Sequence, residues 1–266
     1  MRIWIMLALL SLILFPACTQ TPPVPATDGE LRIITEVYPP YNFIDKNNKV
    51  VGQSTELVEA IIQKLSMTNT VEVMPLAEGL SLLQKGPGVV LFSLNRTSSR
   101  ESLFKWVGPV GGYQQGFFKK AGSEIQISKL EDAKNAGKIG IYRGDAGGQF
   151  LAAQGFTNLD ESQTDAEALK KLMDNRVQLW LGNAKGLDIT LQQAGVSPDS
   201  IVALPAVVIQ ADLYIAFSKD VPDTTIFTWQ KALDSLKEDR DIDGKTVYDK
   251  IKARYDDPGY VQSLLK

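Results

Sequence analysis

The spacing of apolar residues alternates along the chain between the short runs of strands and the three-to-four-residue repeat of helices. Runs rich in branched apolar residues predict strands at 31–37, 71–74, 89–92, 113–119, 138–142, 177–181, 201–209 and 213–217. Apolar residues at helical spacing predict helices at 54–66, 76–85, 149–154, 164–173, 189–194, 225–238 and 246–254. Thr164-Asp165-Ala166-Glu167 is a capping-box pattern that opens one of these helices, and Gly195 ends another. The order strand–helix–strand–helix–strand implies a parallel sheet with crossover helices, so the predicted fold class is α/β.

The first 29 residues have a different pattern. Arg2 precedes an apolar run at 3–15, which is too short for a comfortable bilayer span and is typical of a secretory signal. Cys18 directly follows a small residue, and this arrangement resembles the bacterial lipoprotein signal, in which the cysteine becomes the lipidated first residue. The alternative is an ordinary secreted protein that is cleaved nearby. We expect residues 1–17 to be the signal peptide and 18–29, with three prolines, to be an extended tether.

Composition narrows the function of the remaining chain. The protein has 266 residues, 44% of them hydrophobic, which is enough for one large or two small domains. Its net charge of −3 argues against nucleic-acid binding. It has no histidine and one cysteine, which removes the commonest general base and excludes an internal disulfide or a zinc cluster. A binding protein is favoured over a hydrolase, although carboxylate chemistry stays open, and no cofactor or metal site is predicted.

The segment 93–109 is the strongest candidate for a binding site. It follows the predicted strand at 89–92, and open α/β sheets place their ligand sites beyond the carboxyl ends of strands. It combines small hydroxyl residues, including Ser93 and Thr97, with two guanidinium groups, Arg96 and Arg100. Because a guanidinium can donate two parallel hydrogen bonds to a carboxylate, the segment is interpreted as an anion-recognition loop. The alternative is a solvated loop with both arginines at the surface.

Two further segments follow predicted strands. In the first, Glu36 and Tyr38 precede two prolines; Tyr38 could stack on a ligand and Glu36 could face a ligand cation, or the aromatic residues could simply plug a loop. In the second, Gly144 and Asp145 lead into a helix, whose free backbone N–H groups suit an anion. The alternative role of Asp145 is to cap this helix. This turn lacks both nucleotide-loop patterns, so a nucleotide ligand is not expected.

The order and spacing of these motifs resemble the type II periplasmic solute-binding proteins of polar amino-acid ABC transporters, the family-3 group. The resemblance covers residues 30–255. Its marks are Tyr38-Pro39-Pro40-Tyr41-x-Phe43, Gly52 before a helix, Thr97-x-x-Arg100, Phe104-Lys105-Trp106-Val107-Gly108-Pro109, the turn at 140–148, Arg176-Val177-Gln178, and the run at 214–219.

The resemblance implies two α/β lobes, each a mostly parallel sheet flanked by helices, joined by two hinge crossings. Lobe 1 would be residues 30–112 plus 212–266, and lobe 2 residues 113–211. A monomer would bind a small carboxylate-bearing solute between the lobes and deliver it to an ABC permease. The protein would lie in the periplasm or cell envelope and would be attached to the membrane by its lipid anchor alone. The implied ligand-binding residues are Arg100 for the α-carboxylate, assisted by Ser93, Asn95 and Thr97, then Tyr38, Glu36, Gly144, Asp145 and Ala146.

Two positions depart from the family pattern. The resemblance implies an aspartate for the ligand's α-ammonium group where this chain has Asn183, and a small hydroxyl residue where it has Asp145. Since an uncompensated buried cation is costly, either Asp145 or Glu36 takes over the ammonium group, or the ligand lacks a standard α-ammonium.

The sequence is compatible with two other functions. Cyclohexadienyl dehydratases resemble these binding proteins and use a cleft carboxylate as an acid, a role open in principle to Glu36 or Asp145. A sensory or accessory binding module without a permease is the third hypothesis.

Overall fold

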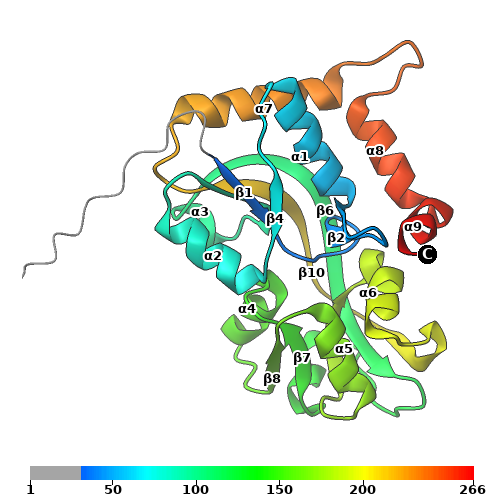
Figure 1. Cartoon of the computed structure of the whole chain (residues 1–266). Helices are drawn as coiled ribbons and strands as arrows, with labels where there is room; N and C mark the ends of the chain where they lie inside the picture. Colours follow the sequence, from blue (N-terminus) through cyan, green and yellow to red (C-terminus); the bar gives the residue numbers. More distant parts are fainter. Residues whose placement is uncertain (1–30) are drawn as a thin grey trace, which may run out of the picture.

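A single curled sheet of eight strands runs through the protein, in the order β4-β1-β5-β10-β6-β9-β7-β8 (Figure 1). The structure is a computed structural model and describes residues 31–266. The predicted signal peptide, the Pro-rich tether and Cys18 lie outside the described residues. Within those residues, no helix is long and apolar enough to span a bilayer.

The upper half of the molecule in Figure 1 contains the first three parallel strands of the sheet. Crossover helices connect them, as the apolar pattern predicts. Their bounds are β1 Arg32–Thr35, α1 Gln53–Lys64, β4 Val71–Val73, α2 Leu76–Lys85 and β5 Val89–Asn95. A two-stranded ribbon and one short helix complete this part: β2 Phe43–Ile44, β3 Val50–Val51 and α3 Ser98–Glu101.

The lower half repeats this arrangement with a second set of parallel strands. Its strands are β7 Ile139–Tyr142, β8 Leu159–Ser162 and β9 Leu179–Asn183. Its helices are α4 Ala146–Ala153, α5 Asp165–Met173 and α6 Leu187–Ala194, with 3-10 turns η1 Leu130–Asn135, η2 Ala184–Gly186 and η3 Pro198–Ser200. Thr164 caps α5 by accepting from the Glu167 N–H, as its capping-box pattern predicts.

Two long antiparallel strands, β6 Lys105–Lys120 and β10 Ile201–Phe217, run through both halves and join them (Figure 1). The sequence prediction was wrong here, because it started a new strand at residue 113 and split β10 after residue 209. Glycines and polar residues interrupt the apolar pattern where the strands pass from one half to the other. The backbone pairing nevertheless continues through Tyr113 and Ala211, so one continuous sheet runs through both halves.

The chain ends in three helices that pack on the upper half: α7 Asp223–Glu238, α8 Val247–Asp256 and α9 Pro258–Leu265. The sequence prediction treated the last segment as a tail and missed α9. Its start is nevertheless encoded locally, because Pro258 occupies the first turn and Asp257 accepts a hydrogen bond from the Gly259 N–H.

Each half has apolar clusters on both faces of the sheet. In the upper half, α1, α7, α8 and α9 cover one face and α2 covers the other. In the lower half, α4 lies on one face and α5 and α6 lie on the other. Helices on both faces explain why the parallel strands read as nearly continuous apolar runs.

Trp229 on α7 tests this packing. Its side chain is 1% exposed and meets the Phe217 ring edge-on, with 5.1 Å between ring centroids. We expect Trp229→Ala to lower the free energy of unfolding by about 3–5 kcal/mol, because it leaves a cavity in the core. Phe227 on the same helix is 60% exposed, so Phe227→Ala should change it by less than about 0.5 kcal/mol. Urea unfolding measures both, and equal midpoints for the two variants would contradict the packing.

Candidate functional site

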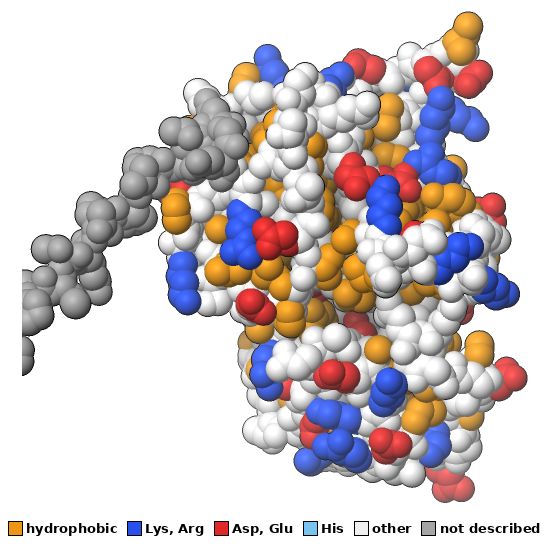
Figure 2. All heavy atoms as spheres, in the orientation of Figure 1, with side chains coloured by type: hydrophobic (Ala, Val, Ile, Leu, Met, Phe, Trp, Pro, Cys, Tyr) orange, Lys and Arg blue, Asp and Glu red, His pale blue; other side chains and the backbone are white. Residues whose placement is uncertain are grey.

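The ends of strands from both halves meet at the waist of the molecule, which Figure 2 shows as a narrowing between the two bodies. Glu36 follows β1 and Asn95 ends β5 in the upper half, whereas Tyr142 ends β7 and Asn183 ends β9 in the lower half. All four side chains are buried. The pairing of β6 with β10 therefore brings the predicted site segments, which are far apart in sequence, to one junction.

Arg100 crosses this junction from α3. Its guanidinium is buried, and Nη2 donates to the Gly144 carbonyl at 2.7 Å and to Gln149 Oε1 at 3.3 Å, both in the lower half. Nη1 donates to the Asn95 carbonyl at 3.3 Å. Arg96 behaves differently: it is exposed, pairs with Glu101, and lies over the rings of Trp106 and Tyr214. The two arginines of the segment thus have separate environments, one internal and one at the surface.

Three buried carboxyl groups lie at the junction: Glu36 and Asp145 act electrostatically on the Arg100 guanidinium, and Asp165 acts on both of these carboxyl groups. Burial raises the pKa of Glu36 well above its usual value, raises the pKa of Asp145, and raises the pKa of Asp165 to about 7. Asp145 caps α4 and accepts hydrogen bonds from Gln115 Nε2 at 3.0 Å and from the Gly147 N–H at 2.9 Å. Its predicted capping role is therefore confirmed, and it also lies within electrostatic reach of Arg100. The junction therefore holds three carboxyl groups and one guanidinium group.

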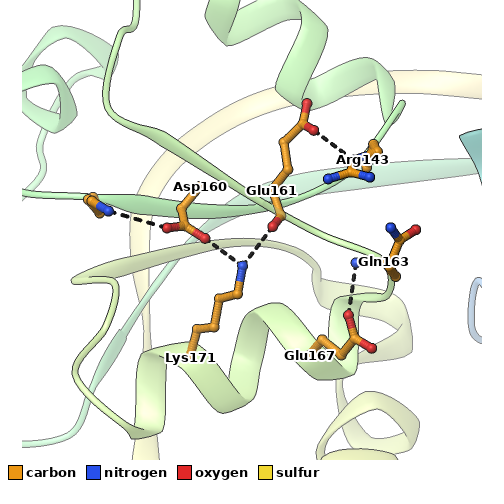
Figure 3. A network of polar contacts seen from close by, with 7 residues as sticks. Arg143, Asp160, Glu161, Gln163, Glu167 and Lys171 are labelled. Carbon is orange, nitrogen blue, oxygen red and sulfur yellow. Dashed lines mark hydrogen bonds and ion pairs between the residues drawn. The ribbon is translucent and has the colours of Figure 1, made fainter.

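Asp165 is the member of this cluster that the sequence prediction missed. The sequence placed it only inside a helix-capping pattern. The structure makes it the first residue of α5, 5% exposed, with its carboxylate accepting from Trp180 Nε1 at 3.2 Å. An ion-pair network fastens α5 to β8, with Lys171 bonded to Asp160 and to the Glu161 carbonyl (Figure 3). A buried tryptophan N–H partner distinguishes Asp165 from an ordinary first-turn acid, but only the fold brings Trp180 beside it.

Glu36 is held from the opposite half. The Leu76 N–H donates to the Tyr142 hydroxyl oxygen at 2.9 Å, and the Tyr142 hydroxyl is in turn hydrogen-bonded to the Glu36 carboxyl. The other carboxyl oxygen, Oε2, has no hydrogen-bond partner among the described residues, although it is buried. The carboxyl group is therefore oriented by protein on one side only.

Aromatic side chains form one wall of the junction. Tyr38 stacks on Tyr41 with 5.8 Å between ring centroids and meets Tyr113 edge-on at 5.9 Å. The hydroxyls of Tyr38 and Ser93 and the Gln115 Oε1 atom are buried without a hydrogen-bond partner in the described part of the chain. Buried polar atoms in folded proteins are nearly always paired with protein, water or a bound molecule, so these atoms make the junction a polar site.

Backbone geometry sets the direction of the loop that carries Arg100. Ser93 has φ 63°, in the left-handed region that non-glycine residues rarely adopt, and it is skipped in the pairing of β5 with β10. This bulge bends the end of β5 next to the site. No pattern in the sequence signals it, since serine is neither glycine nor asparagine.

The side chains of two predicted residues form their hydrogen bonds outside the carboxyl cluster. Thr97 is half-buried and hydrogen-bonds Ser99 at 3.0 Å. Asn183 donates to the Pro39 carbonyl at 3.0 Å and accepts from the Lys185 N–H at 3.1 Å, so its amide joins the two halves. Gly144 and Ala146 flank Asp145 as predicted, with the Gly144 carbonyl on Arg100.

Lys185 strengthens the same contact between the halves. Its Nζ lies 3.1 Å from Asp256 Oδ1 and donates to Gln53 Oε1 at 3.2 Å, both in the upper half. A Cβ at Gly186 would lie 2.0 Å from the Pro39 carbonyl oxygen, so only glycine permits this approach. The halves therefore touch around Arg100, around Tyr142 and around Lys185. Among residues 31–266, no cluster of three or more acidic or sulfur side chains could hold a metal ion.

The raised pKa of Asp165 makes a stability prediction with a definite sign. The folded protein keeps this proton up to about pH 7, whereas a free aspartate loses it near pH 3.8. Folding stability contributed by the protonated form is therefore lost as pH rises from about 4 to 7. We expect Asp165→Asn to raise the melting temperature of the ligand-free protein by about 5 °C or more at pH 8 and by much less at pH 4.5.

The exposed Asp199 serves as the control, because Asp199→Asn should leave both melting temperatures unchanged. Scanning calorimetry at the two pH values measures the effect. An Asp165→Asn variant that is destabilised at pH 8 would show that the carboxylate is ionised without cost.

Comparison with known proteins gives a consistent picture. The chain matches the family model for bacterial extracellular solute-binding proteins, family 3, over residues 31–254. Among curated proteins no sequence matches it. A histidine kinase sensor domain with similarity to periplasmic binding proteins superposes with TM-score 0.74 at 23% identity, covering 86% of this chain and 97% of that one.

Two further solved structures are similar. An ancestral arginine-binding protein bound to glutamine has TM-score 0.73 and 25% identity, and the match covers 86% of this chain and 99% of that chain. An ancestral arginine-binding protein bound to arginine has TM-score 0.73 and 25% identity, and the match covers 85% of this chain and 98% of that chain. The family match spans nearly all of the described residues, and the solved structures share the fold with two α/β lobes. The chain therefore belongs to the family-3 bacterial extracellular solute-binding proteins.

Proposed function

We propose that this protein captures a small amino-acid-type solute between its two halves and delivers it to an ABC permease. The observation that carries the proposal is the buried Arg100 guanidinium, which lies at the junction beside a cluster of carboxyl groups. A guanidinium suits the carboxylate of an amino acid, and the carboxyl groups suit its ammonium group. The similar structures that bind glutamine and arginine support an amino-acid ligand.

The two halves act as lobes that close on the ligand. Lobe 1 comprises residues 30–112 and 212–266, and lobe 2 comprises 113–211. The proposed boundaries fall where β6 and β10 pair through Gly112 and Asp212. Bending of two paired strands is a hinge motion of the kind that closes such proteins around ligands. Asn183 and Lys185 then hold the closed arrangement on one side and Arg100 on the other.

The ligand's orientation follows from the charges. The ligand's carboxylate accepts hydrogen bonds from Arg100, close to Ser93, Asn95 and Thr97. It takes the place of the lower-half acceptors that the guanidinium contacts in this structure, the Gly144 carbonyl and Gln149 Oε1. Its ammonium group faces Asp145 and Asp165. The proposal thereby assigns the ammonium to Asp145 and Asp165 in place of the uncharged Asn183. Tyr38 covers the ligand as part of the aromatic wall.

The proposal also places the protein at the cell envelope and assigns it no enzymatic activity. Cys18 carries a lipid anchor and residues 19–29 are the tether, which suits an extracellular binding family. The cleft carboxylates bind a cation and do not act as an acid on a substrate. Incubation with prephenate should therefore release no phenylpyruvate, the product expected of a dehydratase-like enzyme.

Arg100 gives the direct test. In a thermal-shift screen of the twenty amino acids, at about 100 times the dissociation constant, a bound ligand should stabilise the protein by roughly 2.7 kcal/mol. Isothermal titration with the best ligand should show that Arg100→Ala loses about 3–5 kcal/mol of binding free energy, since a buried charge pair is broken.

Arg96→Ala is the matched control. Arg96 lies four residues away, is exposed and forms a surface ion pair, so its removal should leave the affinity within about twofold of the native protein. Unchanged affinity of the Arg100→Ala variant, with its fold intact by circular dichroism, would falsify the assignment of the carboxylate site.

A further inference from the structure

We propose that Gln149 is an internal competitor for the ligand's carboxylate. Its side-chain oxygen occupies an N–H group of Arg100 that the carboxylate needs, so the ligand binds fully only when the Gln149 side chain rotates away. The inference rests on the proposed function, because it takes the ligand's carboxylate to be on Arg100. It adds a residue that sets the affinity of the site without being part of the bound complex.

The first argument is the use of the donors on the guanidinium. An arginine side chain carries one N–H on Nε and two on each Nη, in a rigid planar fork. Nη2 of Arg100 donates to the Gly144 carbonyl at 2.7 Å and to Gln149 Oε1 at 3.3 Å. Nη1 donates to the Asn95 carbonyl at 3.3 Å. Both N–H groups of Nη2 are therefore engaged by residues of the lower half.

The second argument is the geometry by which a guanidinium binds a carboxylate. Two parallel hydrogen bonds form along the Nε–Nη2 edge or along the Nη1–Nη2 edge. Two surface pairs of this chain use the first edge. Arg32 donates to Glu72 through Nε and Nη2. Arg96 donates to Glu101 through the same two atoms. Because Nη2 belongs to both edges, a ligand carboxylate can bind Arg100 with two bonds only when one lower-half acceptor leaves.

The third argument identifies the acceptor that leaves. The Gly144 carbonyl is part of the backbone of the turn before α4, so it moves only with the lower half. Gln149 is exposed on α4, and its oxygen lies at the longer of the two distances from Nη2. Its Nε2 is only 3.4 Å from the Gly144 carbonyl, which is a long hydrogen bond. Rotation of the Gln149 side chain into water therefore frees Nη2 without moving either lobe.

A competing arrangement makes Gln149 a support for the guanidinium. In that arrangement the Gln149 oxygen orients Arg100 towards the ligand and stays in place when the ligand binds. Loss of the amide then weakens binding, whereas loss of a competitor strengthens it. The sign of the change in affinity separates the two roles.

Gln149→Met keeps the length of the side chain and suits a helix, but it removes the amide. The probes are the twenty proteinogenic L-amino acids, because all of them carry an α-carboxylate. Titration calorimetry of the mature chain should show that the variant binds each amino acid that the native protein binds about three- to tenfold more tightly, which is the effect of one hydrogen bond. The factor should be similar for every bound amino acid, since the competition is for the carboxylate that they share.

Gln149→Glu tests the same contact in the opposite direction. A carboxylate at this position is a charged acceptor for Arg100, so the affinity should fall by at least about tenfold. Gln154 ends the same helix and is exposed. Gln154→Met and Gln154→Glu are therefore the matched controls, and both should leave the affinity within about twofold of the native value. Melting curves establish that each variant is folded.

The outcomes distinguish this inference from the proposed function. Weaker or unchanged binding by Gln149→Met, together with the expected loss in Arg100→Ala, would overturn the competitor role and leave the carboxylate site in place. A gain confined to a single amino acid would place Gln149 beside a ligand side chain and would also overturn the inference. If neither the native protein nor Gln149→Met binds any of the twenty amino acids, the proposed function fails and this inference fails with it.

Discussion

The pairing of β6 with β10 is the constraint on which the rest of the molecule depends. These two strands run through both halves, so each half builds its parallel strands and helices outward from the same pair. As a result, the carboxyl ends of β1 and β5 face those of β7 and β9 across the junction. Segments separated by many residues meet there because of this one long ladder.

Ionisable side chains from both halves meet at the junction. Arg100 comes from the upper half and its best acceptor, the Gly144 carbonyl, comes from the lower half. Asp145 and Asp165 belong to helix starts of the lower half, whereas Glu36 follows a strand of the upper half. Burial raises the pKa of these carboxyl groups, so each of them lowers the folding stability of the protein when it is ionised.

Much of the fold could be predicted because its signals are local. Apolar spacing identified the crossover helices, and Thr164 and Gly195 marked the start of α5 and the end of α6. The errors lie where distant pairing overrides local pattern. β6 and β10 continue through glycine and polar residues because each backbone group finds its partner on the other strand, and no short window of sequence contains that partner.

The candidate site divides in the same way. The residues themselves show that two arginines, an aromatic run and an Asp-led helix follow strand ends, and this was enough to choose the segments. They do not show that Arg100 is buried while Arg96 lies at the surface, that Asp165 sits beside Trp180, or that Asn183 faces Pro39. Burial, pKa and hydrogen-bond partner are properties of a side chain's neighbours in space. Those neighbours exist only after the two halves have folded against each other.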